Sequence, residues 1–185
     1  TTNSQLYLAN QTNVHRTDLL GQFQQENINT AVTSINVLKQ NGWFIDVSKT
    51  KAALTKIKHN TNFTGRLEQV SEEPKILIDA SHNPAGVKNL FLELKNIDYN
   101  NLHCIYGTSS DKDVELVMSH FDFKAQYYFT HFDSARSLNS KILKKTSNKF
   151  KINSNTFSSP KIALNAAKQN YTKGDLIIVF GSFFL

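Results

Sequence analysis

The stretch Ile76-Leu77-Ile78-Asp79-Ala80-Ser81-His82-Asn83-Pro84 decides the fold that the sequence predicts. It begins with an apolar run rich in β-branched residues, which favours a buried strand, and the run ends at Asp79. We expect a helix to start directly afterwards, because Asn83 suits an N-cap and Pro84 suits the first helical position. Such a strand brings a carboxylate and the His82 imidazole to the carboxyl edge of a parallel sheet, beside the positive end of a helix. This arrangement is typical of ligand sites in open α/β sheets.

The stretch opens a series of alternating strands and helices. Short apolar runs predict strands at 75–79, 102–107, 126–130, 150–153 and 176–182, and other patterns predict helices at 84–96, 113–121, 137–147 and 160–170. Strands separated by helices of this length predict βαβ units and a mostly parallel sheet. We therefore expect residues 74–185 to form a complete Rossmann-like α/β domain.

The residues before this domain follow a different pattern. The sequence predicts a short strand at 5–9, a loop at 10–18, and helices at 24–40 and 48–58. This segment, residues 1–62, is expected to be the tail of a larger domain, and residues 63–73 connect it to the α/β domain.

Composition and charge limit the classes of function. No apolar stretch approaches the roughly 18 residues that indicate a membrane span, and the first residues lack the features of a signal peptide. Cys104 is the only cysteine, so no internal disulfide can form, which fits a reducing cytoplasm. The net charge of +6 would suit nucleic-acid binding. However, the densest lysine group falls at helical spacing, which favours a solvated helix face. We expect a cytoplasmic protein with no nucleic-acid and no membrane partner.

Further motifs accompany the Ile76–Pro84 stretch. They are Leu20-Gly21-Gln22-Phe23-Gln24-Gln25-Glu26-Asn27, Phe63-Thr64-Gly65-Arg66-Leu67-Glu68, Asp111-Lys112-Asp113 and the closing Val179-Phe180-Gly181-Ser182-Phe183-Phe184-Leu185. In this order and spacing, the chain resembles the folylpolyglutamate synthase/dihydrofolate synthase family of the Mur ligase superfamily over nearly its whole length. The usual family forms are G-x-H-Q-x-x-N, W-x-G-R-x-E, D-G-A-H-N-P and D-K-D.

The chain departs from these forms at three places. Phe23 stands where the family usually has His, Phe63 replaces Trp, and Ala80-Ser81 replace Gly-Ala. None of these changes removes a group to which a role is given below, although Phe23 is expected to alter the packing around the nucleotide base.

The resemblance implies an enzyme, an ATP-dependent ligase that forms an amide bond. It implies ATP and Mg²⁺ as cofactors, and L-glutamate with dihydropteroate or folate polyglutamates as the other partners. The folate carboxylate would become an acyl phosphate, which the glutamate amine attacks. It also implies that residues 1–62 are the tail of a central ATP-binding domain. No G-x-x-x-x-G-K-[ST] occurs in the sequence. We therefore expect a C-terminal part that is inactive alone, with metal ligands outside it, and a monomer as the full-length enzyme.

Four residues are candidates for the nucleotide site, and each has a plainer alternative. Arg66 presents a planar fork of donors suited to phosphate oxygens, and the alternatives are a surface ion pair with Glu68 or a plain interdomain linker. The resemblance implies that Arg66 contacts the ATP phosphates, that Asp79 accepts from the ribose hydroxyls, that His82 lies at the nucleotide and glutamate side, and that Asn27 contacts the base. The alternatives are a helix cap for Asp79, loop packing for His82 and simple exposure for Asn27.

A second group of residues is predicted to hold the charged groups of glutamate. Its members are Ser109, Asp111, Lys112, Asp113 and Arg136. Ser110 to Asp113 also spells a capping box, so helix capping explains this stretch equally well.

Three other functions stay open. A peptidoglycan Mur ligase would use the same chemistry on another acceptor, and a non-catalytic nucleotide-binding module would need no P-loop. A nucleic-acid-binding domain is suggested by charge only. The D-x-x-H-N-P strand end favours the folate branch of the superfamily.

Overall fold

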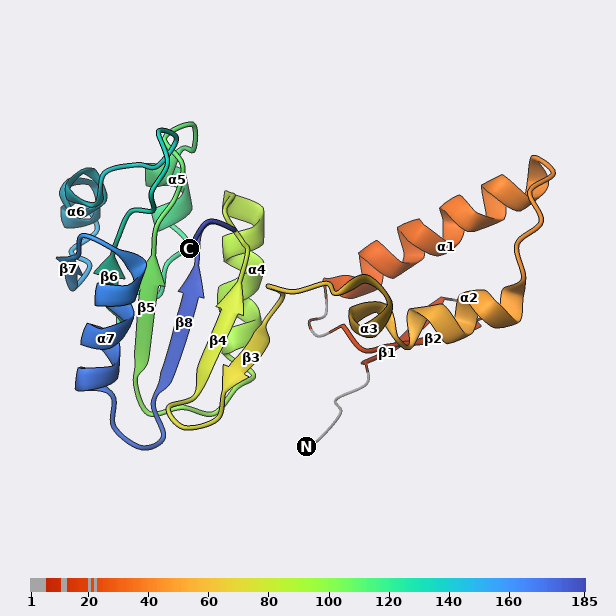
Figure 1. Ribbon diagram of the computed structural model, residues 1–185, viewed down its shortest axis with the longest axis horizontal. Helices are drawn as coiled ribbons and strands as arrows, with labels where there is room; N and C mark the ends of the chain where they lie inside the picture. The colour runs from red at the N-terminus through yellow and green to blue at the C-terminus, as the bar shows by residue number, and fades with distance from the viewer. Residues whose placement is uncertain (1–5, 11–12, 20, 22) are drawn as a thin grey trace. The chain divides into compact units, whose positions relative to one another are not determined.

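The computed structural model describes residues 6–10, 13–19, 21 and 23–185. The chain divides into two compact units, Thr1–Thr64 and Gly65–Leu185 (Figure 1). That the residues of the first unit are the tail of a larger ATP-binding domain remains a prediction.

The second unit is built on a six-stranded sheet. Its strand order is β3-β4-β8-β5-β6-β7. The strands are β3 (Glu68–Ser71), β4 (Ile76–Asp79), β5 (Leu102–Tyr106), β6 (Gln126–Phe129), β7 (Ser154–Thr156) and β8 (Leu176–Phe180). Five strands pair in parallel, and β3 adds an antiparallel edge. The predicted α/β class with a mostly parallel sheet is confirmed. β3 lies within the stretch 63–73 that the sequence marks as a connection.

Helices cover both faces of this sheet. They are α4 (Pro84–Leu94), α5 (Val114–Met118), α6 (Ser140–Asn148) and α7 (Pro160–Asn170). The first three pack on one face, where Leu90, Val117 and Leu143 are fully enclosed. On the other face, α7 buries Ala163 and Ala167 against Ile105 and neighbouring strand residues. Because strand side chains alternate between the two faces, the four inner strands β4, β5, β6 and β8 each contribute to both core clusters.

The predicted helix starts at residues 84 and 160 are confirmed. The Asn83 side chain accepts a hydrogen bond from the Gly86 backbone N–H at 2.8 Å, and Pro84 occupies the first turn of α4. Ser159 caps α7 in the same way, with Pro160 after it. Both N-cap residues have an extended backbone, as is usual at this position. Each helix therefore follows directly on the loop that leaves a strand at the carboxyl edge of the sheet.

The ends of β5 and β8 meet at glycines. Tyr106 of β5 is in register with Phe180 of β8, and Gly181 follows with φ +111°. A Cβ atom on Gly181 would overlap the Gly107 carbonyl oxygen. The two strand ends therefore approach each other closely only because glycine stands there.

One strand prediction is wrong. The sequence predicted a strand at 150–153, whereas β7 covers Ser154–Thr156. Ile152 is buried, but it lies in the turn that closes α6, where its N–H donates to the Ser147 carbonyl and Lys151 has φ +54°. The apolar residues that suggested a strand belong to this packed turn. The edge strand β7 itself is polar.

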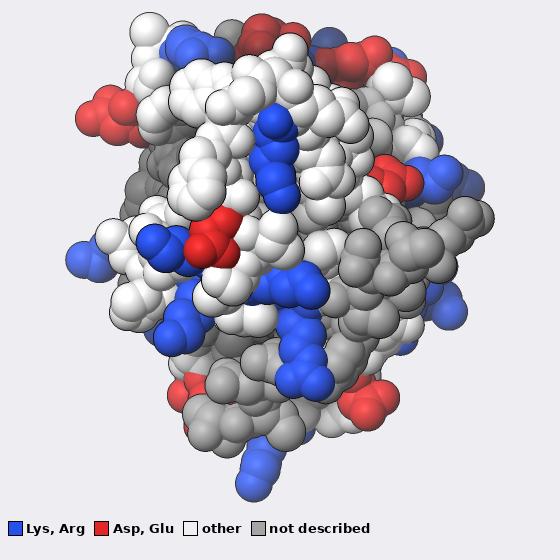
Figure 2. All heavy atoms as spheres, turned by 90° about the vertical axis from the view of Figure 1, so that its right-hand side faces the viewer, with Lys and Arg blue, Asp and Glu red and all other residues white. Residues whose placement is uncertain are grey.

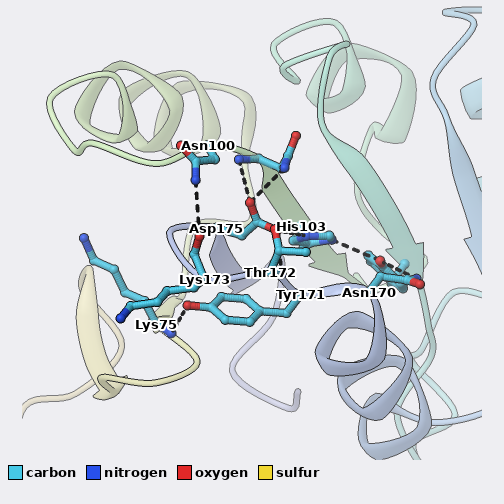
Figure 3. Close-up of polar contacts among 10 residues, drawn as sticks. Lys75, Asn100, His103, Asn170, Tyr171, Thr172, Lys173 and Asp175 are labelled. Atoms are coloured by element: carbon cyan, nitrogen blue, oxygen red, sulfur yellow. Dashed lines mark hydrogen bonds and ion pairs between the residues drawn. The ribbon is translucent and has the colours of Figure 1, made fainter.

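A polar network centred on the buried residues Asp175, His103 and Tyr128 lies at the amino edge of the same sheet (Figure 3). Asp175 receives five hydrogen bonds: from the backbone N–H and side chain of Asn101, from the backbone N–H and hydroxyl of Thr172, and from His103 Nε2. His103 Nδ1 faces the Tyr128 hydroxyl at 3.0 Å, and that hydroxyl accepts from Asn170. A neutral imidazole with its proton on Nε2 satisfies every group, because Tyr128 then donates to Nδ1. The network joins β5, β6 and the loop before β8.

The first unit has a small hairpin and three helices. β1 (Leu6–Asn10) pairs with β2 (Asn13–Thr17), so the predicted loop at 10–18 is wrong over Asn13–Thr17; residues 11 and 12 lie outside the described part. α1 (Gln24–Gln40) is confirmed as predicted. The predicted helix 48–58 is two helices, α2 (Val47–Leu54) and α3 (Ile57–Thr61). The break occurs because the Asp18 carboxylate caps the new start, accepting from the N–H groups of residues 57 and 58.

Two surface properties bear on the partners. Among the described residues, none of the helices combines the length and apolar character needed to cross a membrane. On the face that Figure 2 displays, lysine and arginine side chains are interspersed with acidic and uncharged residues.

Candidate functional site

The Asp79 carboxylate organises the carboxyl end of β4. It is 4% exposed, and each of its oxygens accepts a backbone hydrogen bond. Oδ1 accepts from Ser81 N–H at 2.8 Å, and Oδ2 accepts from Leu67 N–H at 2.9 Å. Asp79 does not cap α4, since Asn83 does. The buried carboxylate instead ties the loop after β4 to the segment before β3.

The segment that carries Arg66 is held by the same loop. The Gly65 carbonyl accepts from Ala80 N–H at 2.8 Å, and the Gly65 N–H donates to Glu68 Oε2 at 2.8 Å. Gly65 has φ +73°, a conformation that suits glycine. A Cβ on Gly65 would touch Ala80 and Phe183 at ordinary van der Waals distances. The turn therefore fits closely against the strand ends.

Arg66 and Asp79 lie side by side. Arg66 Nη1 is 3.9 Å from Asp79 Oδ1, and the arginine side chain keeps 31% of its surface exposed. At this distance the pair attracts without a close hydrogen bond, so the guanidinium donors stay available to a ligand. The described residues show this ion pair and none between Arg66 and Glu68. The plainer alternative of an Arg66–Glu68 surface pair is therefore wrong.

His82 completes this group. Its Nδ1 lies 2.9 Å from the Ala80 carbonyl oxygen and must donate to it, because a carbonyl only accepts. In the neutral ring, Nε2 then carries the lone pair. The half-buried imidazole is held within its own loop, two residues after the Ala80 N–H that binds Gly65. Arg66, Asp79 and His82 therefore come together on two hydrogen-bonded segments at one sheet edge.

The predicted glutamate residues form a second group, at the carboxyl end of β5. Ser109 pairs with Ser137 in an isolated bridge, and Ser110 N–H donates to the Arg136 carbonyl. Lys112 Nζ lies 2.9 Å from Asp111 Oδ2. This hydrogen bond holds the pKa of Asp111 below its usual value, and the charge of Arg136 lowers the pKa further.

Asp113 plays a different part from its neighbours. Its Oδ1 accepts from Leu116 N–H at 3.0 Å, so Asp113 is the N-cap of α5. The capping box predicted from Ser110 is wrong, because the helix starts three residues later. Asp113 thus has a structural task, whereas Asp111, Lys112 and Arg136 present charges on the surface.

An open cleft of about 520 Å³ lies at the carboxyl ends of β6 and β7. Its lining is rich in hydroxyl groups and comprises His131, Phe132, Asp133, Ser134, Ser137, Asn139, Ser158, Ser159 and Pro160. Ser134 and Ser137 flank Arg136 in the chain. No motif in the sequence predicted this cleft, although Ser159 and Pro160 in its wall also form the start of α7.

Asn27 belongs to the first unit. It is exposed on α1, and its Nδ2 donates to Gln24 Oε1 at 2.9 Å. The exposed amide is available to a ligand, and its predicted contact with the nucleotide base stays a prediction.

Glu68, Leu67 and Ser81 support the site and were not predicted from the sequence. Glu68 was considered only as an ion partner of Arg66, yet its carboxylate binds the backbone. The spacing of Gly65-Arg66-Leu67-Glu68 does not by itself indicate this contact, because the folded turn decides which backbone N–H the glutamate reaches.

Comparisons with known proteins identify the family to which the chain belongs. The family described as Mur ligase, glutamate ligase domain, matches residues 65–183. A dihydrofolate synthase/folylpolyglutamate synthase of Buchnera aphidicola subsp. Schizaphis graminum is 30% identical over 159 residues, which cover 84% of this chain and 36% of that protein. A UDP-N-acetylmuramoyl-L-alanyl-D-glutamate–2,6-diaminopimelate ligase of Prochlorococcus marinus is 30% identical over 98 residues, covering 51% of this chain and 18% of that protein.

A solved structure is similar over most of the chain. It is Mycobacterium tuberculosis folylpolyglutamate synthase complexed with ADP, with a TM-score of 0.76 and 26% identity over 90% of this chain and 39% of that one. The chain spans little more than a third of the length of these folate enzymes. The family match covers more than half of the chain, from Gly65 to Phe183. The chain therefore belongs to the Mur ligase family, and residues 65–183 are its glutamate ligase domain.

Proposed function

We propose that this chain is the C-terminal part of an ATP-dependent ligase that joins L-glutamate to a folate carboxylate. The acceptor is dihydropteroate or a folate polyglutamate. The observation that carries the proposal is the grouping of Arg66, Asp79 and His82 at the carboxyl edge of β4. Support also comes from the folate enzyme of Buchnera, which matches 84% of the chain.

Activation of the carboxylate explains the need for ATP. A free carboxylate is a poor electrophile, and transfer of the terminal phosphoryl group makes an acyl phosphate with a good leaving group. The glutamate amine then attacks the acyl carbon and releases phosphate. In this proposal Arg66 binds the phosphates and offsets the charge that develops during transfer. Asp79 accepts from the ribose hydroxyls through lone pairs that its backbone contacts leave free, and Asn27 contacts the adenine base.

His82 has the role of orienting the reacting groups. With Nδ1 fixed by the Ala80 carbonyl, the Nε2 lone pair of the neutral ring accepts a hydrogen bond from the incoming amine. Ser109, Asp111, Lys112 and Arg136 are proposed to bind the charged groups of glutamate. The basic side chains suit its carboxylates, Asp111 suits its ammonium group, and the adjacent hydroxyl-lined cleft supplies room and further donors.

Magnesium is assigned no step in this chain. The described residues contain no group of three or more His, Cys, Asp or Glu side chains able to hold a metal ion. We propose that Mg²⁺ accompanies the ATP phosphates and that its protein ligands lie outside these 185 residues. A cytoplasmic location and a monomeric full-length enzyme likewise remain our proposals.

A peptidoglycan ligase is the second candidate. The diaminopimelate ligase of Prochlorococcus is as similar per residue as the Buchnera enzyme, but it matches only 51% of this chain. Both candidates share the phosphate chemistry. They differ in the acceptor and, by the name of the Prochlorococcus relative, in the amino acid added. The pair of acceptor and amino acid therefore decides between them.

The test uses the complete protein that carries these residues. It is incubated with ATP and Mg²⁺ in two assays: radiolabelled L-glutamate with dihydropteroate or tetrahydrofolate, and radiolabelled 2,6-diaminopimelate with UDP-N-acetylmuramoyl-L-alanyl-D-glutamate as the muramoyl peptide. We expect incorporation of label into a folate acceptor, with one ADP released per glutamate. Incorporation into the muramoyl peptide alone would establish the second candidate. Binding of ADP without any incorporation would leave a non-catalytic nucleotide-binding module.

A further inference from the structure

Glu68 makes an unusual contact for a charged residue at a sheet edge. It is half-buried at the start of β3, and its side chain turns back along the chain. Its Oε2 accepts from the Gly65 N–H at 2.8 Å, which closes a turn around Arg66. A charged acceptor makes a stronger hydrogen bond than a neutral one. This contact therefore fixes the backbone of Gly65, the residue before Arg66.

The backbone of Leu67, the residue after Arg66, is fixed by another carboxylate. Leu67 N–H donates to the buried Asp79 at 2.9 Å, although Leu67 has φ +43°, a conformation that non-glycine residues rarely adopt. The Gly65 carbonyl is also held, by Ala80 N–H. Arg66 is thus the middle residue of a turn whose two neighbours both bind carboxylates and both have positive φ.

We infer that Glu68 is a positioning residue for Arg66: its carboxylate holds the Gly65 turn so that the guanidinium faces the ligand site beside Asp79. This inference rests on the proposed function, in which Arg66 binds phosphate. In the described part of the chain Glu68 forms no ion pair with the guanidinium. It acts through the backbone.

The length of the side chain provides a sharp test. In Glu68→Gln the amide oxygen still reaches the Gly65 N–H, whereas in Glu68→Asp the charge remains but the carboxylate is one methylene too short. We expect the complete enzyme with Gln to keep kcat/KM for ATP within about threefold, and Asp and Ala to lose about tenfold. Glu72→Ala removes a charge from an exposed neighbouring position and serves as the control.

The double variant Arg66→Ala/Glu68→Ala completes the test. If Glu68 acts through Arg66, the double variant is no slower than Arg66→Ala alone, because the two effects are not independent. ADP affinity, measured by titration calorimetry, should follow the same order of variants and keeps the test valid without turnover. A merely structural Glu68 would lower the melting temperature and leave the kinetics of the folded enzyme unchanged.

The outcomes separate the inference from the proposed function. Full losses for Arg66→Ala with normal kinetics and ADP binding for all Glu68 variants would overturn the inference alone. So would an active Asp variant beside an inactive Gln variant, or losses that multiply in the double variant. A wild-type rate for Arg66→Ala would remove Arg66 from the phosphate site and overturn the inference at its premise, whereas a wild-type enzyme that ligates no glutamate would overturn the proposed function.

Discussion

Leu67 N–H donates a hydrogen bond of 2.9 Å to Asp79 Oδ2, across twelve residues of sequence. The bond holds Leu67 at φ +43°, which costs about 1–3 kcal/mol for a residue with a side chain. Such a conformation persists only where the surroundings determine it, and here a buried carboxylate and the Glu68 turn do so. The strain lies directly beside Arg66, where the position of one side chain matters most.

Replacing Asp79 with Asn should loosen this segment. The amide offers one acceptor oxygen where two N–H groups need partners, so Leu67 or Ser81 would face an NH₂ group. We expect the bond that is lost to weaken local stability by about 1–3 kcal/mol. Faster hydrogen exchange in peptides spanning residues 65–82, with unchanged exchange in β5, would report it. Asp98→Asn on the exposed surface is the control, and equal exchange in both variants would contradict the prediction.

Arg66→Ala should remove transition-state stabilisation of about 2–4 kcal/mol from the complete enzyme, the range seen when a preorganised charge-stabilising donor is deleted. Arg66→Lys should recover part of this, because the charge returns without the planar fork. Steady-state kinetics at varied ATP concentration measure the effect of both substitutions. Lys88→Ala, at an exposed position of α4, is the matched control. Equal rates for Lys and Arg at position 66 would show that charge alone suffices.

The main elements of the α/β unit could be predicted because their signals are local. An apolar run and an Asn-Pro pair are enough to fix β4 and the start of α4. The same reasoning failed where a contact distant in sequence decides the outcome. Asp18 splits the predicted helix 48–58, and the buried Ile152 belongs to a turn and not to a strand.

The site shows the same division. Arg66, Asp79 and His82 could be named from their motifs, because the chemistry of a guanidinium, a carboxylate and an imidazole follows from the residue type alone. The support from Glu68 and the strained Leu67 could not be read from pattern, since both depend on which backbone N–H lies opposite a carboxylate after folding. The roles of the named residues toward nucleotide and glutamate remain predictions.

Acidification should destabilise the fold through Asp175. Burial alone would raise the pKa of this carboxyl, but hydrogen bonds from Thr172, Asn101 and His103 outweigh burial and hold it well below its ordinary value of 3.8. A group with a lowered folded-state pKa adds stability above the unfolded-state pKa, and that stability is lost as the pH falls below it. We therefore expect the melting temperature to drop as the pH falls below about 4.

Asp175→Asn identifies the source of this pH dependence. The variant should be less stable than wild type at pH 7, because the amide NH₂ meets donors, and the stability difference should shrink as the pH is lowered from 5 to 3. Thermal unfolding of wild type, Asp175→Asn and the exposed control Asp98→Asn over this pH range measures the effect. A constant difference between wild type and Asp175→Asn would exclude Asp175 as the titrating group.

Gly181→Ala tests the close approach of β5 and β8. At φ +111° an alanine is strained by about 1–2 kcal/mol, and its Cβ would also overlap the Gly107 carbonyl oxygen, which adds about 1–3 kcal/mol. Gly42→Ala is the matched control, because Gly42 has φ +89° with open space around it. It should carry the conformational cost alone.

Urea unfolding measures the loss of stability in both variants. A larger loss is expected for Gly181→Ala, because the strand ends cannot separate without breaking the parallel pairing of Tyr106 with Phe180. Equal losses for the two variants would mean that the strand ends move apart freely, and the edge that holds Asp79 would then be less rigid than its hydrogen bonds indicate.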